Sequence, residues 1–118
     1  MVTDLVENTP GVRGAVIGSA DGHPIASHLR EIAVDAATVA AMGSAMLGLA
    51  TQLARLGTTA TTANSHVRGE GGQVWVLDVG RSASLTVFGA DDADPRLIAS
   101  AAHTTTKRLV SLLSAAAG

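Results

Sequence analysis

The sequence predicts an α/β sandwich, in which helices pack on a five-stranded antiparallel sheet. Three observations lead to this fold class. Residues 12–20 form a run of small apolar side chains that ends at Asp21-Gly22, a pattern typical of a β-hairpin. Residues 36–54 carry no charge and have helical periodicity, and three further strand-like runs lie between residues 61 and 89. With a helix at each end, the predicted order is α-β-β-α-β-β-β-α.

The first predicted element is a short helix over residues 3–8, for which Thr3 is a suitable N-cap. Residues 12–20 are then a strand covered on both faces, because polar and apolar residues do not alternate in this run. Asp21-Gly22 supplies the positive φ angles of a two-residue type I′ turn, and residues 25–28 return as the partner strand. We therefore expect the hairpin to be scaffold.

A long helix is predicted from Asp35, a good N-cap, to about Leu56, with Gly57 as the C′ residue. Two stripes run along it. The bulky stripe recurs at three- and four-residue steps and consists of Val39, Met42, Met46, Leu49, Leu53 and Leu56. The small stripe recurs every four residues and consists of Ala36, Ala40, Ser44 and Gly48. The helix has more apolar surface than one sheet face covers, and exposed apolar patches mark interaction sites.

Three strands and a helix are predicted in the second half of the sequence. Residues 61–68 have high β propensity but mostly polar side chains, and a Gly-rich turn separates them from strands at 73–79 and 83–89. Asp94-Pro95 is an N-cap and N1 pair that opens a last helix reaching about residue 113. Its inner face is expected to hold Leu97, Ile98, Ala101, Thr105, Leu109 and Leu112. No linker divides the sequence, so residues 1–118 are predicted to form one domain.

Composition and charge exclude several classes of partner. The net charge is −2 and only 15% of the residues are charged, so the sequence lacks the basic surface that binds nucleic acid. Cysteine is absent, which excludes disulfides, thiol catalysis and thiolate metal sites. No secretory signal is recognisable, and we expect a cytoplasmic protein. Residues 36–54 are rich in Ala, Gly, Ser and Thr, which favours an amphipathic helix over membrane insertion.

Motifs for catalysis and ligand binding are not found in the sequence. There is no Walker A motif, no G-x-G-x-x-G, no H-E-x-x-H and no G-x-S-x-G. The four histidines match no metal-ligand motif, and they are His23, His28, His66 and His103. Asp91, Asp92 and Asp94 suit a cation or acid–base site, but helix capping explains them more simply. No catalytic residue, cofactor or metal is therefore predicted.

The order and spacing of these elements resemble a known family. The shared features are an initial Leu-containing turn, PGV at 10–12, ADG at 20–22, a long Ala-rich helix opened by Asp35, a strand ending in a Gly-rich hairpin, and a helix entered through DADP at 92–95. They resemble the Roadblock / dynein light chain family over essentially the whole chain. The likeness is greatest to its bacterial Mgl-type branch, whose members regulate Ras-like GTPases in gliding motility and in actinobacterial signalling operons. The element order is that of the profilin-like folds.

The resemblance implies a homodimer, in which two edge strands pair and two long helices lie side by side. It implies a strand interface that consists of Ala63, Ser65 and Val67. It implies a helix interface that consists of Val39, Ala40, Ser44, Leu47 and Gly48. Residues 61–68 suit this role if they form a sheet edge, because no proline or lysine in them blocks pairing with another strand.

The leading hypothesis is a non-catalytic homodimer that binds and regulates a Ras-like small GTPase, as an activator or as a scaffold. The resemblance supplies the partner, and the expected contact residues are Met42, Met46, Leu49, Leu53 and Arg55. The two methionines equally suit a core position, and Arg55 suits either an arginine finger or pairing with the helix dipole.

The alternatives to this function are a small-molecule sensor, with a pocket between sheet and helix, and a general signalling scaffold. An enzyme is not expected, because the sequence shows no nucleophile paired with a general base.

Overall fold

A computed structural model of the protein describes residues 1–30, 32–60 and 63–117. Its elements, in chain order, are α1 (Val2–Asn8), β1 (Val12–Ser19), β2 (Pro24–Leu29), α2 (Ala36–Gly57), β3 (Ser65–Gly69), β4 (Gly72–Val79), β5 (Ala83–Ala90) and α3 (Pro95–Ala117). The predicted order α-β-β-α-β-β-β-α is confirmed. The five strands form one antiparallel sheet, as predicted.

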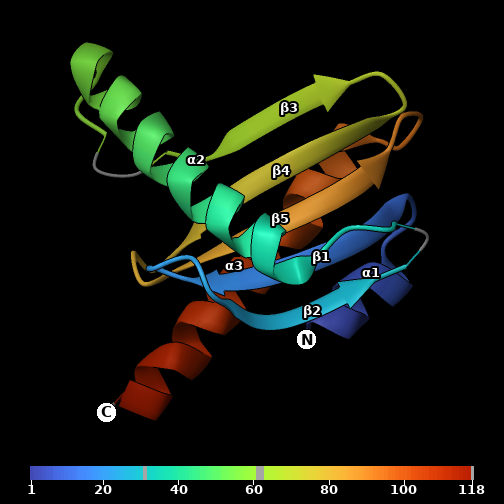
Figure 1. Ribbon diagram of the computed structural model, residues 1–118, viewed down its shortest axis with the longest axis horizontal. Helices are drawn as coiled ribbons and strands as arrows, with labels where there is room; N and C mark the ends of the chain where they lie inside the picture. The colour runs from blue at the N-terminus through green and yellow to red at the C-terminus, as the bar shows by residue number, and fades with distance from the viewer. Residues whose placement is uncertain (31, 61–62, 118) are drawn as a thin grey trace.

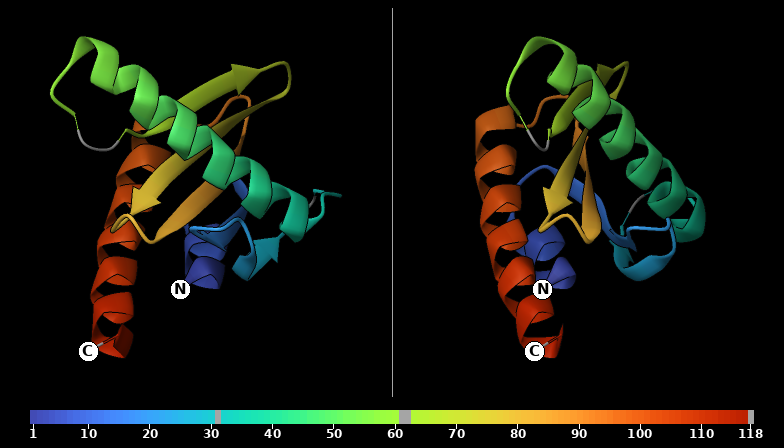
Figure 2. Two further views of the ribbon diagram at one scale, coloured as in Figure 1. Left: turned by 60° about the vertical axis from the view of Figure 1, so that its left-hand side comes forward. Right: turned by 90° about the vertical axis from the view of Figure 1, so that its left-hand side faces the viewer.

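The strands lie in the order β2-β1-β5-β4-β3, so β1 and β5 are central and β2 and β3 are the edges. Figure 1 shows α2 crossing one face of the sheet diagonally, with its C-terminal turns extending past the strands. Figure 2 shows α1 and α3 on the opposite face. The molecule therefore has three layers, with the sheet in the middle.

The main hydrophobic core lies between the sheet and the layer formed by α1 and α3. Ile17, Leu77 and Leu85 extend from the sheet, and Val6 and Ile98 meet them from the two helices. Each of these side chains is at most 5% exposed. Burial of one such side chain stabilises the fold by about 1.5–3 kcal/mol, so this face supplies most of the hydrophobic stabilisation.

The turn between β1 and β2 differs from the predicted type I′ turn. Gly22 has a φ of +87°, but Asp21 does not have a positive φ. The Gly22 N–H donates to the Ser19 carbonyl (3.0 Å), and the Ser19 N–H donates to the His23 carbonyl (2.8 Å). This pattern is a type I turn followed by a glycine in the left-handed region. The two-residue prediction was wrong because the Ser19 hydroxyl, which donates to the Asp21 carboxylate, closes a longer loop.

Two helix ends also differ from their predictions. α1 begins at Val2, so Thr3 lies inside the helix rather than at its N-cap. Gly57 is the last residue of α2 rather than a left-handed residue beyond it. Thr58 caps this helix in an extended conformation, since its N–H and its hydroxyl both donate to the Ala54 carbonyl, each at 2.8 Å. A side-chain hydroxyl thus replaces the expected glycine cap.

The buried face of α3 is rotated relative to the predicted one. The buried side chains recur at three- and four-residue steps and belong to Ile98, Ala102, Thr105, Thr106 and Leu109. Leu97 and Leu112 were expected inside but are 46% and 55% exposed. Leu97 is displaced by about 100° around the helix from Ile98. Leu112 belongs to the C-terminal half of α3, and Figure 2 shows the C-terminal turns of this helix extending past the sheet.

Candidate interaction surface

The long helix α2 rests on the sheet through its smallest residues. Val39, Ala40 and Gly43 are its buried positions. A Cβ atom added to Gly43 would lie 2.6 Å from Oγ1 of Thr86 on β5, and one added to Gly18 of β1 would lie 3.0 Å from Cβ of Ala40. Both distances are shorter than ordinary contacts, so glycine at these positions sets how closely helix and sheet approach.

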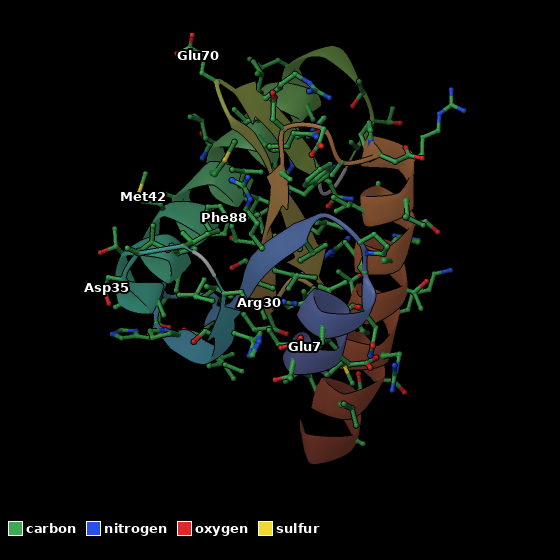
Figure 3. All side chains as sticks on the ribbon, turned by 90° about the vertical axis from the view of Figure 1, so that its right-hand side faces the viewer. Glu7, Arg30, Asp35, Met42, Glu70 and Phe88 are labelled. Atoms are coloured by element: carbon green, nitrogen blue, oxygen red, sulfur yellow. The ribbon has the colours of Figure 1, made fainter. Side chains whose placement is uncertain are left out.

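The bulky apolar residues of α2 face away from this contact. Met42, Leu49 and Leu53 are each 68% exposed, and Leu56 is 85% exposed. Together with the half-buried Met46, these residues are called the α2 stripe: Met42, Met46, Leu49, Leu53 and Leu56. Figure 3 shows Met42 pointing outward from the helix. Of the predicted bulky stripe, Val39 alone belongs to the core of this chain.

An apolar groove runs between the first half of the α2 stripe and the sheet. It has a volume of about 490 Å³, and Met42 and Met46 line its helix side. Val76 and Phe88 line its sheet side, and Val34, from the segment before α2, also lines it. Apart from Asp35 and two threonines its lining carries no side-chain charge or hydroxyl, so the groove suits an apolar occupant.

The edge strand β3 borders this apolar region. It pairs with β4 on one side, and no strand in the described part of the chain pairs with its other side. Val67 is opposite Val74 in the register, which places it on the α2 face of the sheet, and it is 45% exposed. β3 was expected to begin at residue 61, but residues 61–62 lie outside the described ranges, and Ala63 precedes the strand.

The other face of β3 is held by polar contacts that the sequence did not reveal. The His66 ring stacks on Trp75 with 4.5 Å between ring centroids, and its Nε2 lies 3.0 Å from Oε1 of Gln73. Arg68 Nη2 donates to the same oxygen at 3.2 Å. The buried Gln73 amide in turn donates to the Ala90 carbonyl at 3.0 Å. These contacts anchor the edge strand, whose outer side pairs with no strand in the described ranges.

The residues predicted for a dimer interface fall in different places. Val39 and Ala40 are inside the core of the chain itself, and the Ser44 hydroxyl donates to the Ala20 carbonyl at 2.8 Å. Leu47 and Gly48 line a cleft on the side of α2 opposite to the stripe. Ala40 thus packs against the chain's own sheet, whereas the prediction placed it against a partner helix, and Gly48 has no atom within 4 Å of an added Cβ. The reason is that small residues suit any close backbone neighbour, a sheet as well as a helix.

Titratable residues form scattered pairs. Glu7 bridges His28 and Arg30, with 3.0 Å contacts to each. His23 lies 3.2 Å from Asp21, whose pKa is lowered by the hydrogen bond from Ser19 and then by His23. Within residues 1–30, 32–60 and 63–117, no group of three or more His, Asp or Glu side chains could hold a metal ion.

Residue Asp94 caps α3 as expected. Its Oδ1 accepts a hydrogen bond from the Arg96 N–H at 3.0 Å. Asp91 lies beside Arg68, with 3.8 Å between Oδ1 and Nη1. The capping interpretation of this acidic segment therefore agrees with its contacts.

Among the described residues, α2 is the one helix whose length and composition would allow it to cross a membrane. Its most apolar 18-residue window has a mean hydropathy of 1.3, and 22% of that window is buried. Core helices of water-soluble proteins meet the same criterion, so it is weak evidence for a membrane span. Exposed apolar patches of this kind also mark contacts between proteins.

The chain is similar to known proteins in sequence and in fold. The sequence model of the Roadblock/LC7 domain matches residues 1–88. No curated protein sequence matches the chain. Among solved structures, a Roadblock/LC7 domain from Streptomyces avermitilis has 22% identity and a TM-score of 0.85, over 96% of this chain and 94% of that one.

Two further structures show how widely this fold is shared. Myxococcus xanthus MglB has 16% identity and a TM-score of 0.83, over 94% of this chain and 89% of that one. Acanthamoeba castellanii profilin IA has 16% identity and a TM-score of 0.63, over 94% of each chain. At these identities the likeness concerns the fold, and it confirms the predicted profilin-like sandwich.

Proposed function

Because the chain belongs to the Roadblock/LC7 family, we propose that it is a non-catalytic homodimeric module that binds and regulates a Ras-like small GTPase. The observation that carries the proposal is the exposed α2 stripe beside the open edge of β3. An apolar surface next to an unpaired strand suits contact with protein. The GTPase partner is proposed from the resemblance to the bacterial Mgl-type branch.

In the proposed dimer, β3 of each chain pairs with β3 of the other across a twofold axis. Such an interface is self-complementary, so the same strand serves both chains. Ser65 and Val67 remain the strand contacts, as the resemblance implied. On the helix, we move the dimer contact away from the predicted residues, because Val39 and Ala40 are already buried in the chain. The contact we propose instead consists of Met42, Leu49 and Leu53, which were expected to contact the GTPase.

The proposed GTPase surface is then the outer side of the paired helices. Arg55 lies in the last turn of α2, where a positive charge is stabilised by the helix dipole. We assign it this role rather than that of an arginine finger. The regulator therefore acts by binding, and the GTPase supplies the catalytic groups.

Sedimentation of the purified protein tests the dimer. The wild type is expected to have twice the 11.8 kDa mass of one chain. Leu53→Asp should be monomeric, because a carboxylate would be buried at the helix contact. The matched control is Leu112→Asp, the same change at an exposed position on α3, which should remain dimeric. A Leu53→Asp protein that is still dimeric would refute this interface.

Affinity capture from the source cell's lysate tests the partner. Immobilised wild type is compared with Leu53→Asp, each with a GTP analogue or with GDP, and bound proteins are identified by mass spectrometry. We expect a Ras-like GTPase on the wild type, in amounts that differ between the nucleotides. If a folded, dimeric wild type retains no small GTPase in either arm, the regulatory proposal fails while the dimer stands.

A further inference from the structure

A second concave site lies on the side of α2 that the apolar stripe does not occupy. This cleft has a volume of about 390 Å³. Ser44, Gly48, Thr51 and Arg55 line its helix side. With 100° between successive residues, these positions lie on average about 150° around the helix from the α2 stripe. The cleft therefore stays outside the proposed dimer contact.

The floor of the cleft holds a hydroxyl group that lacks a hydrogen bond. Ser84 on β5 lines the cleft and is 2% exposed. Its Oγ makes no hydrogen bond to any described residue. Nearly all buried polar groups in proteins are hydrogen-bonded, and an unpaired one is costly. Among the residues that line the cleft, Ser84 is the one with a buried side-chain oxygen that lacks a hydrogen-bond partner.

The charge of the cleft is opposite to that of the whole chain. Arg55 and Arg81 contribute two positive charges to its lining and Asp78 one negative charge, whereas the chain carries a net charge of −2. The Asp78 carboxylate already accepts a hydrogen bond from the Arg81 backbone N–H at 3.2 Å. Guanidinium groups bind phosphate and carboxylate oxygens in a planar, two-point geometry. The lining thus favours an anion.

The backbone at Arg81 supports the same conclusion. Arg81 has a φ of +65°, and within the described ranges it is the one residue other than glycine with a positive φ. It follows Gly80, at +60°, in the tight turn between β4 and β5. Glycine or asparagine would occupy this position with less strain. Strained residues of this kind are concentrated at functional sites, where the side chain is needed.

We propose that this cleft binds a small molecule that carries an oxyanion, either a phosphate or a carboxylate group. The Arg81 guanidinium holds the oxyanion together with Arg55, and the Ser84 hydroxyl hydrogen-bonds to the ligand at the floor. Leu47 offers an apolar contact for the rest of the molecule. The module would then bind a small molecule on one side of α2 and a protein on the other.

Titration of the ¹⁵N-labelled full chain, followed by NMR at constant ionic strength, tests the proposal. The probes are inorganic phosphate, pyrophosphate and succinate. We expect saturable shifts at the Arg81 and Ser84 amides with at least one probe, and the probe that binds identifies the oxyanion. If no probe gives saturable shifts at these amides, the proposal is wrong.

Variants separate a built site from general charge effects. Arg81→Gly relieves the positive φ, so it should fold at least as stably as the wild type yet bind about tenfold more weakly or worse, through loss of a charge-assisted contact. Ser84→Ala should also weaken binding. The matched control is Arg108→Ala, which removes the same charge from the exposed side of α3 and should bind as the wild type does. Equal weakening in Arg108→Ala and Arg81→Gly would overturn the proposal.

Discussion

Gly22 meets two separate constraints in the turn between β1 and β2. Its φ is +87°, and a Cβ atom there would lie 3.2 Å from Cα of Ala41 on α2. Next to it, the Ser19 hydroxyl lowers the pKa of the Asp21 carboxyl, and His23 adds to this effect. The carboxylate therefore remains ionised, and accepts its hydrogen bond, to a lower pH than an ordinary aspartate. At this scale, single residues shape the turn and join it to the helix.

The substitution Gly22→Ala is expected to reduce the free energy of unfolding by about 1–3 kcal/mol, because alanine is strained at positive φ and its Cβ would press on α2. Urea denaturation measures this loss. Gly69→Ala is the control, since Gly69 has no atom within 4 Å of an added Cβ and no positive φ. Equal losses in both variants would contradict the role given to Gly22.

At the scale of elements, glycine residues set the position of α2, because they have no side chain to hold the helix away from the sheet. Gly43 lies against Thr86, and Gly18 lies against Ala40. The helix therefore packs closely on the sheet along a narrow contact, and its large side chains remain on the outer sides. The same contact leaves the apolar groove on one side of α2 and the charged cleft on the other. One packing choice thus creates both candidate sites.

We expect Gly43→Ala to destabilise the protein by about 1–3 kcal/mol, because its Cβ would overlap Oγ1 of Thr86. Adding Thr86→Ala removes that oxygen, so the double variant should recover part of the loss, with a coupling energy of about 0.5–3 kcal/mol in a double-mutant cycle. Gly48→Ala, in the same helix but in open space, should instead stabilise by up to about 1 kcal/mol. If the free-energy changes of Gly43→Ala and Thr86→Ala simply add in the double variant, the contact between Gly43 and Thr86 is ruled out.

At the scale of the whole molecule, the sheet needs a helical layer on each face. The Roadblock/LC7 match ends at residue 88, yet α3 begins at Pro95 and covers the larger core. Ile98 and Ala102 are fully buried against the sheet. Without α3, the apolar face of β4 and β5 would be exposed to water. We therefore expect the stable unit to include residues beyond the matched domain.

Replacing Ile98 with alanine should cost about 2–5 kcal/mol of unfolding free energy, since it leaves a cavity at a fully buried position. Thermal and urea denaturation both report the change. Leu112→Ala, on the exposed part of the same helix, should stay within about 0.5 kcal/mol of the wild type. An Ile98→Ala protein as stable as the wild type would mean that the α3 layer is dispensable.

The order of the elements could be predicted from the sequence by itself, whereas the edge position of β3 was only a condition of the dimer hypothesis, which the strand order meets. The element order depends on local signals, such as the apolar run before Gly22 and the Asp94-Pro95 pair that opens α3. These signals act over a few residues, through backbone conformation and side-chain periodicity, so they are readable without a three-dimensional structure. The family resemblance rests on the same order of signals.

Only the tertiary structure decided which side of α2 meets the sheet. Ala40 and Met42 are two residues apart, and periodicity alone permits either to face inward. The packing of Gly43 against Thr86 resolves this choice, because close approach to the sheet excludes large side chains there. The cleft likewise joins Ser44, Arg81 and Ser84, which are brought together by the crossing of helix and sheet rather than by any motif. Contacts between distant segments carry no local signal, and for that reason the sequence left both sites undefined.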